Sequence, residues 1–409
     1  MAEIPFIDTL SAEYDADIHS AHRVARERSA IARTPVGLAF LRYDAVLWLL
    51  RDRRWHEYGA RALPGAGISE GPLWEWFHQI MSNKEGEDHA RLRRLVSKAF
   101  TPRRIERLRP LMRETANDLI DRFVDDGSCE FVAAFAAPYP VRVISALLGV
   151  PPEDFDRFHA WSRDLALAFG SRIAEERERI ESALVSLNDY VDGLLSERAK
   201  APRDDLISAL LAVEEEGDVL TREELRALVT VLIFGGQDTT QCQLACALAT
   251  FTAHPDQWQR LGREPELAAS AAEEVLRFEP AGSGSPRIAI EDIDYEGLEI
   301  PSGTIALPSA PAANRDPLIY PDPDRFDITR EPAQPMLTFG GGAHYCLGAT
   351  LARYELQESL AILTRRLPGL EKAGEASWRR GALIRGPETL PIEFTPGLSA
   401  SDASGRTTP

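Results

Sequence analysis

The chain has 409 residues, 44% of them hydrophobic, and a formal net charge of −18 at pH 7. This acidic balance disfavours nucleic acid as a partner, and the apolar fraction is ordinary for a globular protein with a substantial core. No linker, repeat or low-complexity tract divides the sequence. We therefore predict one domain over residues 1–396 and a disordered tail over residues 397–409, which has no apolar periodicity.

Cysteine content and apolar runs bear on the cellular location. Four cysteines at irregular spacing fit a reducing compartment better than a disulfide framework. Residues 1–10 contain acids and a proline and lack the features of a secretory signal. The most apolar long segment, residues 227–251, is interrupted by Gly235 and the polar residues after it, which makes it a poor membrane span. We expect a soluble, cytoplasmic protein without a membrane anchor.

The N-terminal part predicts a helix over residues 12–32, a short strand over 36–42 and a helix over 43–51. Residues 52–86 mix glycine, proline and serine with Trp55, Trp74, Trp76 and Phe77. Such a segment predicts a long irregular stretch, either a functional loop or a flap packed on the surface.

His89 and Arg93 are four residues apart, so on a helix both point the same way. They could clamp one anionic group, or they could belong to a solvated helix face. Residues 91–113 contain nine basic residues and one acid, Glu106. In an acidic chain this is either a candidate docking surface for an acidic partner or a solubilising surface.

The middle of the chain predicts successive amphipathic helices over residues 108–125, 140–149, 153–169 and 173–198. A long apolar helix follows the capping sequence at Thr221. Within it, Gly235 and Gly236 precede Asp238 and Thr239, and this cluster predicts a local opening or kink. A carboxylate beside a hydroxyl can pass protons into an apolar pocket. The alternative is a buried polar kink that only bends the helix.

The C-terminal third begins with a predicted helix over residues 264–278, in which Glu274 and Arg277 form a pair that is usually of little energetic value. Alternating runs predict short strands near residues 287–290, 294–300, 304–307 and 390–394.

Cys346 stands at the exit of a glycine-rich loop, directly before a predicted helix. A thiolate there is stabilised by the free N–H groups of the helix start. The glycines permit close approach, which suits a flat cofactor lying against the loop. A lone cysteine by itself is more often a small buried residue.

Phe339, Gly340, His344, Cys346 and Gly348 together decide between these readings, because they resemble the haem-binding signature FxxGxHxCxG of the cytochrome P450 family. The pair His89 and Arg93, the run 235–240 and the ExxR motif before residues 321–326 resemble further motifs of that family, in the same order. The resemblance extends from the first helix to Phe394. It implies a mainly α fold, with a minor β-rich region, that encloses haem b.

The resemblance also implies roles for individual residues. Cys346 would be the axial thiolate ligand of the iron, and Thr239 would hydrogen-bond dioxygen while Asp238 relays protons from solvent. Gly235 replaces the alanine expected in the family, which would enlarge the pocket. The residues implied to bind haem propionates are His89, Arg93, Arg287 and His344.

Other segments receive structural roles from the same resemblance. Glu274, Arg277 and Arg325 would lock the segment behind the haem loop. Residues 52–86 would cover the substrate with their aromatic side chains facing it, and Leu383 and Ile384 would belong to a turn that reaches into the substrate pocket.

The implied activity is insertion of one oxygen atom from O2 into an apolar small molecule such as a terpenoid, steroid, polyketide, fatty acid or cyclic peptide. The alternative is diversion of the substrate radical to desaturation or to C–C or C–N coupling. The acid–threonine pair disfavours a peroxide-using enzyme or an isomerase, and no segment is left over for the effector region of a haem sensor. We expect a monomer that receives electrons from a separate ferredoxin or flavodoxin.

Overall fold

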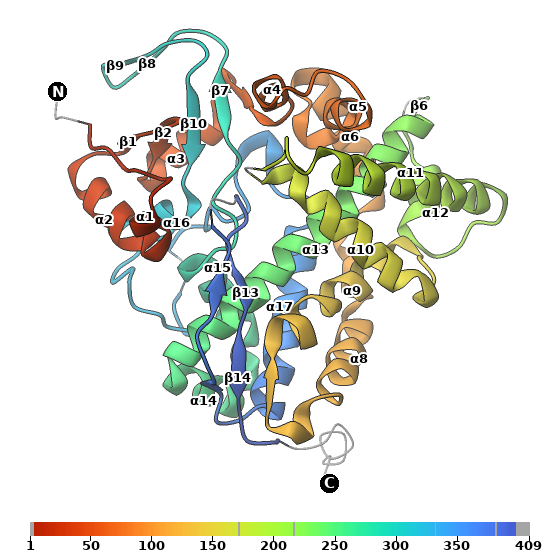
Figure 1. Cartoon of the computed structure of the whole chain (residues 1–409), viewed down its shortest axis with the longest axis vertical. Helices are drawn as coiled ribbons and strands as arrows, with labels where there is room; N and C mark the ends of the chain where they lie inside the picture. The colour runs from red at the N-terminus through yellow and green to blue at the C-terminus, as the bar shows by residue number, and fades with distance from the viewer. Residues whose placement is uncertain (1–3, 171, 216, 332, 381–382, 398–409) are drawn as a thin grey trace.

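The computed structural model describes residues 4–170, 172–215, 217–331, 333–380 and 383–397. Helices make up most of the chain, and a smaller β-rich region lies at the upper left of Figure 1, near the N-terminus. The predicted class, mainly α with a minor β-rich region, is confirmed. The α-helices are α1 (Ala12–Ala16), α2 (Ile18–Arg28), α3 (Tyr43–Arg51), α4 (Gly59–Ala62), α5 (Pro72–Gln79), α6 (Gly86–Ala99), α7 (Pro102–Glu106), α8 (Arg109–Ile120), α9 (Pro138–Leu148), α10 (Phe155–Ala166), α11 (Arg177–Lys200), α12 (Leu206–Leu211), α13 (Arg222–Ala253), α14 (Pro255–Arg263), α15 (Ala268–Phe278), α16 (Ala310–Ala313) and α17 (Ala349–Arg366).

The largest sheet has the strand order β1-β2-β10-β7-β3, and a second sheet has the order β11-β14-β4. Three hairpins, β5-β6, β8-β9 and β12-β13, complete the strands of the described residues. The predicted strands near 287, 304 and 390 are confirmed as β7, β10 and β14, whereas the single strand predicted over 294–300 is a hairpin of two strands, β8 and β9. The strands are β1 (Ile31–Thr34), β2 (Gly37–Phe40), β3 (Trp55–Glu57), β4 (Ser128–Glu130), β5 (Glu214–Glu215), β6 (Asp218–Val219), β7 (Arg287–Ala289), β8 (Ile293–Tyr295), β9 (Leu298–Ile300), β10 (Ile305–Pro308), β11 (Glu371–Lys372), β12 (Ser377–Trp378), β13 (Pro387–Thr389) and β14 (Pro391–Glu393).

Helix α13 is the central element, and α9, α10, α11, α15 and α17 pack around it (Figure 1). Thr221 caps its start: its hydroxyl accepts from the Glu224 N–H, and the Glu224 carboxylate accepts from the Thr221 N–H. The helix continues through Gly235 and Gly236 without interruption, so the predicted opening is not a break in the helix. Nowhere in the described ranges is a helix both long and apolar enough to cross a membrane.

Residues 52–86 are not the irregular segment that their composition predicts. They contain β3, α4 and α5, and a 3-10 turn at Met81–Asn83. The aromatic side chains face the core: Trp55 packs against Phe40, and Trp76 and Phe77 pack against Phe169. The expectation that these aromatic side chains face a ligand is therefore wrong. The residues of this segment that line the cavity described below are Glu57, Met81 and Ser82.

The glutamate of the ExxR motif is buried and binds two arginines. Glu274 pairs with Arg277 at 2.7 Å and with Arg330 at 3.2 Å. The predicted third member, Arg325, is wrong: its side chain is 68% exposed and pairs with Asp327. Arg330 reaches Glu274 because its guanidinium also donates to the carbonyls of the preceding turn, those of Pro321, Asp322 and Arg325. The network therefore fastens residues 321–330 to α15.

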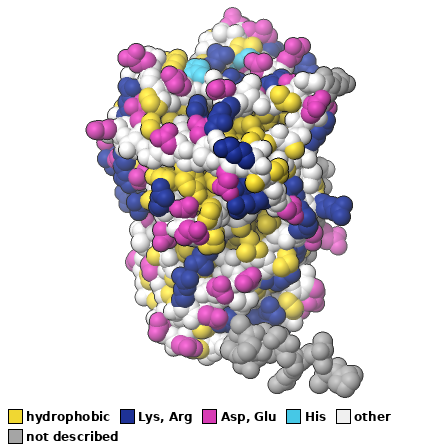
Figure 2. Space-filling view, turned by 90° about the vertical axis from the view of Figure 1, so that its right-hand side faces the viewer, with side chains coloured by type: hydrophobic (Ala, Val, Ile, Leu, Met, Phe, Trp, Pro, Cys, Tyr) yellow, Lys and Arg dark blue, Asp and Glu magenta, His cyan; other side chains and the backbone are white. Residues whose placement is uncertain are grey.

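Most of the basic residues over 91–113 are neutralised within the chain. Arg91, for example, binds Asp218 at 2.7 Å and Glu224 at 2.6 Å. Seven of the nine have an acidic partner: Arg91, Arg94, Lys98, Arg104, Arg107, Arg109 and Arg113. On the face shown in Figure 2, basic and acidic side chains are interspersed. These acidic partners reduce the net positive charge of residues 91–113, and docking of an acidic partner on this segment stays a prediction.

The predicted disordered tail lies outside the described residues except for Gly397, whose N–H donates to the Arg366 carbonyl at 3.0 Å.

Arg330 and Arg325, one inside the buried network and one outside it, give a matched test of that network. Replacing Arg330 with methionine leaves Glu274 with one partner fewer in a buried position, and we expect it to lower the free energy of unfolding by about 1–3 kcal/mol. Arg325→Met removes an exposed pair and should change it by less than about 0.5 kcal/mol. Urea unfolding followed by circular dichroism measures both values. Equal losses in the two variants would contradict the assignment of Arg330.

Candidate active site

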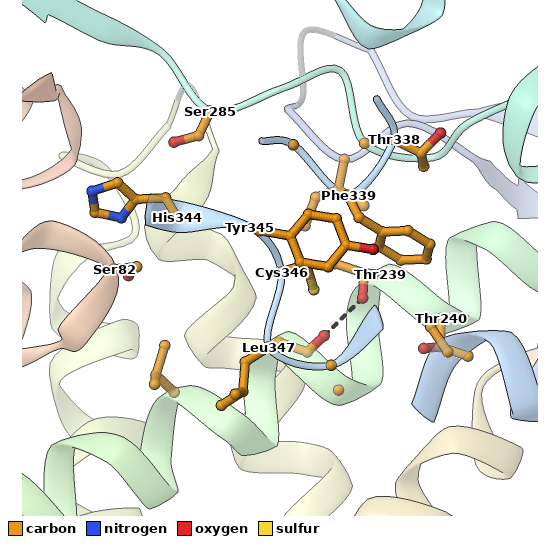
Figure 3. A pocket seen from close by; sticks show the side chains of 18 of the residues that line it. Ser82, Thr239, Thr240, Ser285, Thr338, Phe339, His344, Tyr345, Cys346 and Leu347 are labelled. Atoms are coloured by element: carbon orange, nitrogen blue, oxygen red, sulfur yellow. Dashed lines mark hydrogen bonds between the residues drawn. The ribbon is translucent and has the colours of Figure 1, made fainter. Parts of the chain in front are cut away.

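A cavity of about 460 Å³ lies between α13 and the loop that precedes α17 (Figure 3). This volume falls within the range of roughly 300–1,000 Å³ typical of small-molecule sites. Most of its walls are aliphatic or aromatic. The predicted residues His89, Arg93, Gly235, Thr239, Arg287, Phe339, Gly340, His344, Cys346 and Gly348 all line it. One predicted site residue, Asp238, does not.

The loop that carries Cys346 is closed by its own backbone. The Cys346 N–H donates to the Phe339 carbonyl at 2.9 Å, and the Gly340 N–H donates to the Leu337 carbonyl at 2.9 Å. Gly342 has a φ of 66°, and a Cβ at this position would lie 2.4 Å from the Leu50 carbonyl oxygen. A glycine is therefore required there, and the close contact places the loop against α3.

The Cys346 thiol opens onto the cavity beside the start of α17 (Figure 3). Burial raises its pKa, while the Gly348 N–H, Arg93 and Arg353 act in the opposite direction by favouring the thiolate. The loop thus presents one sulfur atom to the cavity with backbone donors behind it, as expected for a thiolate at a helix start.

Helix α13 contributes Thr239 from the other wall. The Thr239 hydroxyl donates to the Gly235 carbonyl one turn earlier at 2.7 Å (Figure 3). Asp238 turns away from the cavity and accepts two hydrogen bonds from Arg379, at 2.8 and 2.9 Å. The acid and the hydroxyl that the sequence places side by side therefore point in different directions.

Two histidines, His89 and His344, and two arginines, Arg93 and Arg287, gather at one end of the cavity. The ring centroids of His89 and His344 are 4.2 Å apart, and Arg287 pairs with Glu57 at 2.5 Å. Burial, with His344 and Arg93, lowers the pKa of His89 to about 4, so this ring is neutral at pH 7. In the described residues the Arg93 guanidinium makes no hydrogen bond or ion pair.

These observations fit a flat apolar cofactor with acidic groups. The half-buried Arg93 cation faces the cavity and lacks an anionic partner in the described part of the chain, and burying such a charge unpaired is costly. A Cβ added at Gly340 or at Gly235 would meet no atom within 4 Å, so open space lies in front of both backbones. The sulfur of Cys346 supplies a soft ligand suited to iron.

Three residues of the site were missed by the sequence analysis. Glu355 lies on the cavity wall; burial raises its pKa well above the usual value, and it accepts from the Thr240 hydroxyl at 3.4 Å. An acid on the apolar face of α17, four residues after Leu351, was the available signal. Arg379 and Glu57 lie far from their partners in sequence, and no local pattern marks either of them.

The comparisons with known proteins agree with this geometry. The family model for cytochrome P450 matches residues 130–367. Luteothin monooxygenase of Streptomyces thioluteus is 39% identical over 397 residues, which cover 96% of this chain and 97% of that protein. Mycinamicin IV hydroxylase/epoxidase of Micromonospora griseorubida is 43% identical over 311 residues, which cover 75% and 77% of the two chains.

A solved structure extends the agreement to the fold. The P450 enzyme CxnD, described as acting in C–S bond formation in chuangxinmycin biosynthesis, superposes with a TM-score of 0.86 at 30% identity, over 98% of this chain and 99% of that one. The chain belongs to the cytochrome P450 family. It is a haem-thiolate monooxygenase whose cofactor is haem b.

The two glycines of α13 give a test of the cavity wall. Gly235→Ala should raise the free energy of unfolding by up to about 1 kcal/mol, because alanine favours the helix and its methyl group enters open space. Gly236→Ala places a Cβ 3.0 Å from Ile144 and should gain less or lose stability. Thermal unfolding of both variants checks the order. A larger gain at Gly236 would contradict the described packing.

Proposed function

We propose that this P450 inserts one oxygen atom from O2 into an apolar natural product, with Cys346 as the iron ligand and Thr239 as the residue that handles protons. The observation that carries the proposal is that Cys346 and Thr239 line the same largely apolar cavity from two different elements. Electrons come from a separate ferredoxin or flavodoxin.

Haem b, when bound, supplies the oxidising chemistry that activates O2, and the chain positions it and the substrate. Cys346 would supply the sulfur ligand of the iron, a donor whose electron density suits the cofactor to activation of O2. Phe339, Gly340 and Gly348 would hold the cofactor, and Gly235 would leave space for it. The side chains that would bind its propionates are His89, Arg93, Arg287 and His344.

Thr239 and Asp238 divide the handling of protons. The Thr239 hydroxyl already faces the cavity, where it can donate to a reacting oxygen atom and accept a proton from behind. Asp238 reaches it only after leaving the two hydrogen bonds from Arg379. Release from Arg379 is therefore the step that would bring the Asp238 carboxylate to the hydroxyl.

The substrate end of the cavity selects apolar compounds. Its walls are formed by Met81, Phe169, Leu232, Leu383 and Ile384, with Ser82 as a hydroxyl among them. Leu383 and Ile384 are held in place because the Arg385 N–H donates to the Ala281 carbonyl at 2.7 Å and the Ser283 N–H donates to the Leu383 carbonyl at 3.0 Å. The similarity to the polyketide biosynthesis cytochrome P450 PksS of Bacillus subtilis, 36% identical over 363 residues, supports a substrate from polyketide biosynthesis.

A second outcome of the same site is radical coupling or desaturation. The similarity to CxnD, which forms a C–S bond, supports this alternative. The same residues hold the cofactor and exclude water in oxygen insertion and in coupling or desaturation. The site therefore does not distinguish the two reactions, and the product must be analysed.

Isotope labelling tests the proposed reaction. The purified protein is supplied with NADPH, a surrogate ferredoxin and its reductase, a panel of polyketides and oxygen-18 gas. We expect substrate-dependent NADPH consumption and a product that carries one labelled oxygen atom, as found by mass spectrometry. An unlabelled, dehydrogenated or coupled product would support the alternative. Absence of any product from the whole panel would contradict the proposal.

Replacing Thr239 with alanine tests the assigned proton handling. We expect haem binding to persist while product formed per NADPH falls at least about tenfold and hydrogen peroxide appears, because general acid–base groups contribute roughly 100-fold or more. Thr250→Ala is the matched control: its hydroxyl makes the same bond to the carbonyl four residues earlier on α13 but lies away from the cavity. If Thr239→Ala forms as much product per NADPH as the wild type, Thr239 has no role in proton handling.

A further inference from the structure

A buried carboxyl group stands among the residues that face the acidic end of the cofactor. Glu57 lies on β3 directly opposite Arg287 of β7, and the two side chains are 6% and 5% exposed. One Glu57 oxygen pairs with Arg287 at 2.5 Å, and the other accepts from the Ser285 hydroxyl at 2.6 Å. Glu57 also lines the cavity, and the His344 ring lies 3.8 Å from it.

A second glutamate completes this group. Glu85, just before α6, accepts from the Glu57 N–H at 2.6 Å and contacts His344 Nε2 at 3.1 Å. At this end of the cavity Arg287 is therefore already paired with Glu57, and Glu85 lies next to the same strand. A propionate that binds Arg287 adds negative charge directly beside these two carboxyl groups.

The two glutamates differ in their capacity to take up a proton. Burial would raise the pKa of Glu85, but bonds from His344 and from the Glu57 N–H outweigh it and lower the pKa. Burial raises the pKa of Glu57, although Arg287, His344 and Ser285 oppose the rise. Carboxylates that share a site cannot all ionise, because each negative charge disfavours the next. Glu57 is the glutamate placed to become neutral.

We propose that Glu57 is a further cofactor-binding residue, which takes up a proton when haem binds and donates it as a hydrogen bond to a propionate that shares Arg287. The inference rests on the proposed roles of Arg287 and His344. In the haem-free protein Glu57 is the carboxylate partner of Arg287. On haem binding one proton from solvent converts it to a carboxylic acid, and the propionate takes its place as the anion beside Arg287.

The linkage has a definite sign. Glu57 has a higher pKa in the haem-bound protein than in the haem-free protein under this proposal. Between these two pKa values the haem-bound protein holds one proton more, so raising the pH within that range weakens haem binding. One linked proton gives a change of up to about tenfold per pH unit. Glutamine at position 57 keeps a neutral hydrogen-bond donor and cannot ionise, so it abolishes the dependence.

The experiment measures the rate at which the holoprotein loses haem to excess apomyoglobin, followed by the Soret band from pH 6 to pH 9. We expect the wild-type rate to rise with pH, the Glu57→Gln rate to stay constant over the same range, and the two to differ most at high pH. Glu87→Gln, an exposed glutamate of the same charge on α6, is the matched control and should follow the wild type.

Ser285→Ala provides a second variant that does not alter the carboxyl group itself. Its hydroxyl stabilises the ionised form of Glu57, so its removal should move the midpoint of the pH dependence upward. A pH slope retained in Glu57→Gln, a parallel acceleration at every pH, or an unmoved midpoint in Ser285→Ala would overturn the inference. The carbon monoxide spectrum of the same wild-type sample separates these results from failure of the proposed function, which would show as loss of the thiolate-type band.

Discussion

The main constraint on the site is the position of one sulfur atom at the wall of an apolar cavity. Cys346 sits where a loop with tightly constrained glycines meets the start of α17, so the backbone supplies donors to the sulfur without placing a polar side chain in the cavity. Gly342 brings this loop into contact with α3, and residues 321–330 behind it are tied to α15 through Glu274. The ion pairs of Glu274 thus help to position a single atom.

Charge compensation is the second organising constraint. Several charged side chains in the interior pair with a partner from a distant part of the chain: Asp238 with Arg379, Glu57 with Arg287 and Glu274 with Arg330. Leaving one partner unpaired in such a place costs more than the pair contributes to stability. The half-buried Arg93, which faces the cavity without such a partner in the described residues, therefore indicates an anionic ligand.

The sequence predicted which local motifs line the cavity better than it predicted which distant residues contact each other. The spacing around Cys346 and the run from Gly235 to Thr240 are local patterns, and the structure brings both to one cavity because each is confined to one loop or helix. Partners from distant segments could not be read in this way: Arg325 and Arg330 are equally plausible from composition, and only the folded turn selects Arg330. Likewise, the aromatic residues near Trp76 signal burial of some kind, but whether they face a ligand or the core depends on tertiary packing.

The central claim is that Cys346 is the sulfur ligand of the haem iron. The most direct test is the difference spectrum of the reduced protein with and without carbon monoxide, for the wild type and for Cys346→Ser. Thiolate ligation predicts a strongly red-shifted Soret band in the wild type and its loss in the variant. A wild-type band at the position typical of histidine-ligated haem, or an unchanged red-shifted band in Cys346→Ser, would contradict the account.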